Sequence, residues 1–298
     1  MVEIKELFKH SNSDWIKYSD YEYKATPEGE LYLTPAENAT ISIVNPLQAA
    51  DALLVDALNI GHLCMPEQPD MPKIKAQILA FVKQYGLLGL MTSYPLKLDF
   101  IEKKEVLLNT NPLTDKSVMK TAAYLKHFLP FCTDTAIMES PHNNIAGVET
   151  SSLPITMFMD RPPVYEIVFS NKYAEKFDWL MNAFRYWYVH LGACSYYDKT
   201  EEDIIRQLHV QTMQTFSMQG LSYRIKLVKT PTIVWEFPSL KAAIDALYSF
   251  YVTDPERPLR ICKHCGKAFV AKNRRTEFCT VPCRNQFNVY KSRRKQGG

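Results

Sequence analysis

The strongest constraint on the fold of this chain is a set of four cysteines near its C-terminus. They form two pairs, Cys262-x-x-Cys265 and Cys279-x-x-x-Cys283, and 13 residues separate the pairs. Zinc prefers four ligands in a tetrahedron, and thiolate sulfur is one of its usual ligands. The spacing therefore predicts that the tail folds around one Zn²⁺ ion. Because four thiolates leave no open position for water, we expect this ion to be structural rather than catalytic.

The residues around the cysteines predict the local structure. Gly266, directly after the first pair, supplies the backbone freedom that a tight metal-binding turn needs. Residues 268–270 are strand-like, and residues 272–275 are typical of a turn. Thr280 is an expected helix N-cap with a proline two residues later, which would place Cys283 on the first helical turn, facing the metal. A hairpin followed by a helix that carries the second pair is typical of a treble clef.

The run CKHCGKAFVAKNRRTEFCTVPCRNQFNVYKSRRK resembles the bacterial C-terminal zinc fingers of the CGNR and related treble-clef type. In those fingers a C-x-x-C-G turn precedes an aromatic-Cys-x-x-x-Cys-Arg helix. Here Arg-Asn-Gln follows Cys283 in place of Gly-Asn-Arg, and the spacing of the second pair is closer to the FCS-type fingers. Proteins with the CGNR finger are regarded as transcriptional regulators, so the resemblance implies DNA binding.

Charge is distributed unevenly along the chain. The segment 257–298 contains 12 Lys or Arg and one acidic residue, Glu277, which gives +11. Because the whole chain carries +3, residues 1–256 carry −8. A basic tail on an acidic remainder is expected of a module that contacts nucleic acid. A tail that docks on its own acidic body would have the same pattern.

The basic residues of the tail fall in two places, the expected hairpin turn and the expected final helix. On that helix one face carries a basic stripe, and Phe287 and Tyr290 occupy a neighbouring face that could pack on the finger. His264 lies inside the first turn and is expected to be exposed. Basic and amide side chains can contact phosphates and base edges. The predicted nucleic-acid contacts are Lys272, Arg274, Arg275, Arg284, Asn288, Lys291, Arg294 and Lys295.

Residues 1–253 are predicted to form a mainly helical α+β body with a few short strands. Apolar spacing predicts helices over 73–85, 116–128 and 172–191, and a capping box at 200–203 predicts another helix to 216. Alternation with period two predicts a hairpin over 221–237, after which Ser239 caps a last body helix. We expect an internal boundary near 140–163, and a linker plus finger over 254–298.

Isolated polar residues in the body are interpreted as structural. His190 and Cys194, four residues apart, are expected at a helix end, and His62 and Cys64 have no evident third metal ligand. Glu175, with Asp178, is expected on a solvated helix face. We find no nucleotide-binding glycine loop, nucleophile elbow or HExxH motif.

The N-terminal segment has scattered charges and no apolar core of a signal peptide, and no run approaches the ~20 apolar residues of a membrane span. We therefore expect a cytoplasmic protein without membrane contact. In a reducing compartment, clustered cysteines bind metal rather than form disulfides.

Three hypotheses follow from the sequence. The leading one is a nucleic-acid-binding regulator that prefers DNA to RNA, whose helical body senses a ligand or mediates homo-oligomerisation. The second is an enzyme that acts on nucleic acid through an unidentified active site, and we favour a non-enzymatic function over it. The third is a protein-interaction module with purely structural zinc, which would be favoured if the body covered the basic helix.

Overall fold

The computed structural model describes residues 11–12, 15–93, 105–107, 113, 116–133, 167–218, 221–227 and 229–296. It confirms the predicted fold class, because helices dominate and the strands form small two- and three-stranded sheets. Within the described residues, no helix is long and apolar enough to cross a membrane. The expected boundary near 140–163 lies outside the described residues, and the division between residues 253 and 254 stays a prediction.

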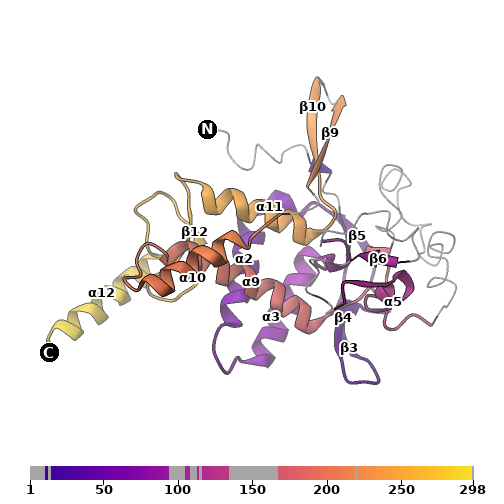
Figure 1. The fold of residues 1–298 in the computed structure, drawn as a ribbon, viewed down its shortest axis with the longest axis horizontal. Helices are drawn as coiled ribbons and strands as arrows, with labels where there is room; N and C mark the ends of the chain where they lie inside the picture. The colour runs from indigo at the N-terminus through magenta and orange to yellow at the C-terminus, as the bar shows by residue number, and fades with distance from the viewer. Residues whose placement is uncertain are drawn as a thin grey trace.

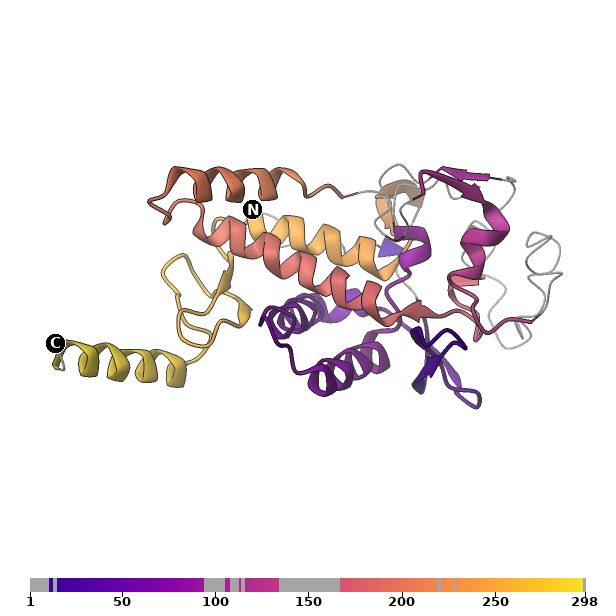
Figure 2. The same ribbon diagram turned by 60° about the horizontal axis from the view of Figure 1, so that its bottom comes forward.

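Four helices form the centre of the molecule in two layers, α9 with α11 above α2 with α3 (Figure 2). Helices α2 and α9 are in close contact at Gly61, where a Cβ atom would lie 2.2 Å from the carbonyl oxygen of Phe184. Only glycine allows that crossing, because any side chain would force the two helices apart. The bounds of the four helices are α2 Ala50–Leu63, α3 Met71–Tyr85, α9 Phe177–Tyr196 and α11 Leu240–Thr253.

Short strands and helices surround this centre. Strand β2 (Trp15–Tyr18) pairs with β5 (Ile41–Val44), and β8 (Glu175–Lys176) joins the hairpin of β3 (Tyr21–Ala25) and β4 (Leu31–Pro35). The remaining elements of the body are β1 Ser11–Asn12, η1 Pro46–Ala49, α4 Leu90–Ser93, β6 Glu105–Leu107, β7 Val118–Lys120, α5 Thr121–Lys126, α10 Asp203–Gln214, β9 Ser222–Leu227 and β10 Pro231–Glu236.

Several local predictions are confirmed. Helix α3 begins two residues before its predicted start and ends where expected, and its five predicted inward residues are all buried (Ile74, Ile78, Phe81, Val82 and Tyr85). The Ser239 hydroxyl accepts the N–H of Ala242 at 2.9 Å and so caps α11 as predicted. The predicted hairpin over 221–237 is the antiparallel pair β9 and β10.

Other local predictions are wrong. The segment expected as helix 116–128 begins with β7, and only α5 is helical there. The capping box at 200–203 does not form, because the Thr200 hydroxyl donates back to the carbonyl of Tyr196 at 3.0 Å and Glu202 makes no side-chain cap. The helix expected from 172 begins at Phe177, after the short strand β8 has joined β4.

The correction with the largest structural consequence concerns Glu175, which is fully buried rather than solvated. Its carboxylate accepts the backbone N–H groups of Leu88 and Leu90 at 2.9 and 2.7 Å, and the Tyr173 hydroxyl at 2.9 Å. Burial raises the pKa of Glu175 to about 7, although these hydrogen bonds act in the opposite direction. The carboxylate therefore holds the irregular segment between α3 and α4 in place by accepting hydrogen bonds from its backbone.

Candidate metal centre

The first cysteine pair lies in the turn between β11 (Leu259–Ile261) and β12 (Ala268–Val270), which pair antiparallel. The N–H of Gly266 donates to the carbonyl of Cys262 at 3.0 Å, and the N–H of Cys262 donates to the carbonyl of Lys267 at 2.9 Å. Gly266 has φ +73°, the left-handed conformation that glycine adopts most readily. These bonds close a tight turn that presents Cys262 and Cys265 on the same side.

The second pair lies at the start of α12 (Val281–Gln296). The N–H of Cys283 donates to the Thr280 hydroxyl at 3.3 Å, which is the predicted N-cap. Cys279 precedes the helix, and its N–H points to the sulfur of Cys262 at 3.4 Å. The cap therefore fixes the orientation in which the helix delivers its cysteine to the first pair.

The structure brings all four predicted ligands together. The sulfur atoms of Cys262, Cys265, Cys279 and Cys283 lie within 4.8 Å of one another, and none forms a disulfide. The distances from the Cys279 sulfur to those of Cys265 and Cys283 are 3.6 and 3.5 Å. A tetrahedron with metal–sulfur bonds of ~2.3 Å has edges of about 3.8 Å. Four sulfurs at this spacing therefore fit a single tetrahedral metal ion.

The four sulfurs can all be thiolates only if a bound cation offsets their negative charge. Burial alone would raise the pKa of Cys262. The hydrogen bonds from the backbone N–H groups of Cys265, Cys279 and His264 outweigh burial and lower the pKa to about 6. Burial and the neighbouring sulfurs raise the pKa of Cys279 to about 12. One thiolate is thus favoured by the fold, and further thiolates require a bound cation to offset their mutual repulsion.

The alternation of β12 joins the metal cluster to the body. Ala268 faces the main hydrophobic core, whereas Phe269 packs with Cys262 and Ala271 in a separate small core around the sulfurs. Because successive side chains of a strand point to opposite faces, one three-residue strand serves both cores. The hairpin of the finger is consequently part of the body's packing.

Three side chains of the central helices hold the hairpin. The amide of Asn59 on α2 pairs with the backbone of Ala268, accepting its N–H at 2.9 Å and donating to its carbonyl at 3.3 Å. The Tyr188 hydroxyl on α9 donates to the carbonyl of Gly266 at 2.5 Å. The ring of His62 packs so closely on Gly266 that a Cβ there would lie 2.7 Å from its Cε1 atom.

Two arginines of the finger are paired with acids. Arg257 lies 3.3 Å from Asp51 of α2, and Arg274 lies 2.7 Å from Glu256 while also donating to the carbonyl of Pro255 at 2.6 Å. Arg274, one of the predicted nucleic-acid contacts, is therefore engaged within the finger. The other predicted contacts in the turn, Lys272 and Arg275, are exposed and make no ion pair within the described residues.

Helix α12 leaves the finger and extends away from the body, with the C-terminus at its far end (Figures 1 and 2). Its base is anchored by two ring contacts. Phe287 lies 5.2 Å from Phe278 between ring centroids, and Tyr290 stacks on His264 at 5.9 Å. His264 is therefore half-buried, not exposed as expected.

The predicted contacts on α12 lie along the projecting part. Arg284, Asn288 and Lys291 are exposed, and no ion pair involves them within the described part of the chain. Arg294 and Lys295 fall in the last turn of α12, and their side chains lie outside the described residues. An open hollow between the hairpin turn and the start of α12 is lined by Lys272, Arg275 and Arg284.

The polar cluster around His190 is internally satisfied. The ring nitrogens of His190 lie 2.6 Å from the Tyr248 hydroxyl and 3.0 Å from the carbonyl of Met213, and the Cys194 sulfur lies 3.6 Å away. Burial raises the pKa of Cys194, which disfavours a nucleophilic thiolate. The interpretation of this pair as structural agrees with these contacts.

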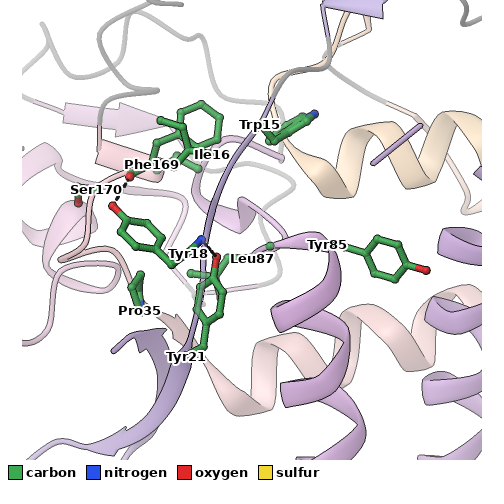
Figure 3. Close-up of a pocket in the computed structure, with 11 residues that line it drawn as sticks. Trp15, Ile16, Tyr18, Tyr21, Pro35, Tyr85, Leu87, Phe169 and Ser170 are labelled. Atoms are coloured by element: carbon green, nitrogen blue, oxygen red, sulfur yellow. Dashed lines mark hydrogen bonds between the residues drawn. The ribbon is translucent and has the colours of Figure 1, made fainter. Parts of the chain in front are cut away.

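Aromatic residues line a small hollow beside β2 (Figure 3). The Tyr18 hydroxyl donates to the carbonyl of Phe169 at 2.8 Å, and the backbone N–H of Tyr18 donates to the Tyr21 hydroxyl at 3.0 Å. The hollow offers only about the space that a single water molecule needs. We therefore regard it as a packing gap rather than a substrate site.

No family model matches the chain, and neither curated proteins nor solved structures give a match. The site itself has to carry the functional argument. The spacing in the sequence predicted that the four cysteines would cluster, but the sequence contained no signal for Asn59 or Tyr188, which hold the hairpin that carries the first cysteine pair. These residues act through contacts about 80 to 210 positions away in sequence, and local patterns contain no information at that range.

Proposed function

We propose that the C-terminal module is a treble-clef finger with one structural Zn²⁺, and that it binds nucleic acid, DNA in preference to RNA. The observation that carries the proposal is the exposed basic helix α12, which the body leaves uncovered. The protein would act as a nucleic-acid-binding regulator, with its helical body as the sensing or oligomerising part.

Zinc is the metal that this donor set favours. Four thiolates in a tetrahedral arrangement select zinc over calcium or magnesium, which prefer oxygen ligands. The closed ligand set of Cys262, Cys265, Cys279 and Cys283 leaves no site for a reacting water. Zinc would connect the docked hairpin to the projecting helix.

The exposure of α12 favours nucleic-acid binding over docking on the acidic body. Arg284 and Lys291 are exposed although residues 1–256 carry −8. Within the described residues, the ring contacts of α12 lie at its base. A helix of this length that projects into water is marginally stable, and a binding partner would stabilise it. The polyanionic backbone of a nucleic acid complements its charge.

A projecting helix favours DNA over RNA. The major groove of B-DNA admits an α-helix, whereas the major groove of A-form RNA is too deep and narrow for side chains to read. In this proposal Lys272, Arg275 and Lys291, which are exposed, would contact phosphates beside the groove, and Asn288 would contact the bases.

The test is fluorescence anisotropy of the full-length protein with labelled duplex DNA and duplex RNA, each at several salt concentrations. The variant is Arg284→Glu/Lys291→Glu. Its control is Lys126→Glu, an exposed lysine of α5 at the opposite end of the molecule (Figure 1). We expect salt-sensitive binding to DNA that weakens at least ~100-fold in the variant, because several counterions are released per complex, and no change in the control.

Binding to neither polymer at low salt would refute the proposal. Equal weakening by Lys126→Glu would mean that overall charge, not α12, carries the binding. Tighter binding to RNA than to DNA would reverse the proposed preference. Zinc content is measured on the same samples, so that loss of the metal is distinguished from loss of a contact.

A further inference from the structure

The hairpin of β9 and β10 stands away from the body as a two-stranded ribbon (Figure 1). Six residue pairs join its strands, from Ser222 opposite Glu236 at the base to Leu227 opposite Pro231 at the tip. The short strand β1 pairs only with the base of β10, at Trp235 and Glu236. A two-stranded ribbon has marginal stability in water on its own, so a second surface is expected to support it.

One face of the ribbon is wholly apolar. Residues directly opposite each other in an antiparallel pair point to the same face, and every second pair shares that face. Ile225 and Leu227 are exposed by 72% and 80%, and Tyr223 and Ile233 by 60% and 49%. The three pairs on this face are Tyr223 with Trp235, Ile225 with Ile233, and Leu227 with Pro231.

The other face of the ribbon differs. It carries an ion pair between Arg224 and Glu236 at 2.9 Å, and Val234 is buried there with 8% exposure. The polar face therefore carries an ion pair and a buried valine, whereas Tyr223, Ile225, Leu227 and Ile233 leave most of the apolar face open to solvent. Trp235, at the base of that face, packs against the main hydrophobic core. Single exposed hydrophobic residues are common, but a contiguous apolar face on a projecting arm marks an interaction site.

We propose that this apolar face is the contact between two copies of the chain, which pack their ribbons face to face about a two-fold axis. None of the six side chains on the face is charged, so it offers nothing to a nucleic acid or a charged peptide. A second copy presents the same apolar surface in the same shape, which is the requirement of a two-fold interface.

The order of side chains along the ribbon selects the antiparallel arrangement. The bulky pair of Tyr223 and Trp235 lies at the base, whereas Leu227 and Pro231 lie at the tip. With the two ribbons antiparallel, each aromatic base meets a smaller tip, and Ile225 of both copies lies near the axis. The two bodies then stand at opposite ends and do not collide. Pairing through the edge of β9 would instead leave the apolar face in water.

The size of this contact predicts a dimer of moderate affinity. Six-residue strands are about 20 Å long, and mating two such faces buries on the order of 1,000 Å² in total, the lower limit for a specific interface. We therefore expect a dissociation constant on the order of micromolar. The inference does not depend on zinc or nucleic acid and can be tested without either ligand added.

The first test is sedimentation velocity of the full chain between about 1 and 100 μM, the range set by the expected affinity. The wild type should move from one chain of 34.4 kDa to twice that mass. Ile225→Glu should remain a monomer throughout, because the dimer would bury two carboxylates at the axis. Thr232→Glu is the matched control, since it places the same charge opposite Lys226 on the other face, and it should dimerise as the wild type does.

The second test determines whether the two ribbons are antiparallel, and it does not require a variant that disrupts the dimer. Tyr223→Cys and Leu227→Cys chains are mixed and mildly oxidised, with the wild type as control for the native cysteines. The antiparallel arrangement predicts more covalent dimer in the mixture than in either variant alone. A wild type that stays monomeric at 100 μM, or an Ile225→Glu variant that dimerises like the control, would overturn the proposal.

Discussion

The two halves of the finger share one metal cluster but stand in opposite environments. The hairpin of β11 and β12 is packed into the body, where Asn59 and Tyr188 hold its backbone. Helix α12 begins after Cys279, carries Cys283 in its first turn, and extends away from the body beyond its anchored base (Figure 2). Basic charge in a tail therefore does not fix its role: Arg257 and Arg274 pair with acids, whereas Arg284 and Lys291 form no ion pair within the described residues.

Removing the metal should break the connection between the halves, and we expect this to be the largest effect. Structural zinc supplies on the order of 10 kcal/mol of folding free energy in small finger modules. Cys279→Ser should lose stoichiometric zinc and raise amide hydrogen exchange in residues 262–283 by at least ~100-fold, because the finger has only a small core of its own. Exchange within α2 should stay unchanged.

Cys132→Ser is the control for the zinc prediction, since Cys132 is half-buried and lies outside the cluster. It should retain one zinc per chain and the exchange pattern of the wild type. If exchange within α2 rises together with that of the finger in Cys279→Ser, the metal holds the whole molecule. The hairpin would then not be anchored by the body independently.

The second prediction tests how firmly the hairpin is docked. Gly266→Ala places a Cβ on a left-handed residue and against the His62 ring. It should lower the free energy of unfolding by about 1–3 kcal/mol, which corresponds to roughly 2–8 °C in Tm for a chain of this size. Thermal unfolding of the zinc-loaded protein measures it.

Gly192→Ala should raise the free energy of unfolding instead of lowering it, and so serves as the matched control. Gly192 lies inside α9 with nothing within 4 Å of the added Cβ. Alanine in a helix interior stabilises by about 0.5–1 kcal/mol relative to glycine. An unchanged Tm in Gly266→Ala would show that His62 moves aside freely and that the hairpin is loosely held.

The sequence predicted those parts of the finger and of the body that depend on neighbouring residues. The spacing of the cysteines, the Thr280 cap and the inward face of α3 all follow from local patterns, and the structure agrees with each. Glu175 shows where this information ends. Its sequence neighbours indicate a solvated helix, but in the structure Glu175 is buried and accepts the backbone N–H groups of residues 88 and 90. The cost of burying a carboxylate is offset only by groups that the fold brings from elsewhere.

The projection of α12 was outside the reach of the sequence for a related reason. A basic helix that docks on an acidic body and one that extends into solvent have the same charge pattern, and the residues 1–256 carry enough negative charge for either. In the structure, the acids that contact Arg257 and Arg274 of the finger are already engaged. Asp51 accepts the Tyr251 hydroxyl and pairs with Arg257, and Glu256 pairs with Arg274.

The smallest expected effect comes from single truncations that compare the two halves directly. Arg274→Ala removes an exposed ion pair, which contributes no more than about 1 kcal/mol to stability. Lys291→Ala removes an exposed cation that has no partner within the described residues, so stability should not change.

On DNA, Lys291→Ala should reduce the slope of log affinity against log salt by about 0.9, the value for one lost phosphate contact. Arg274→Ala should change that slope less, because Glu256 and the Pro255 carbonyl already hold its guanidinium. Equal slopes for the two variants would mean that Arg274 leaves its ion pair to bind phosphate. In that case the docked hairpin, and not the projecting helix alone, would be part of the contact surface, and the contrast between the halves would be one of packing rather than of role.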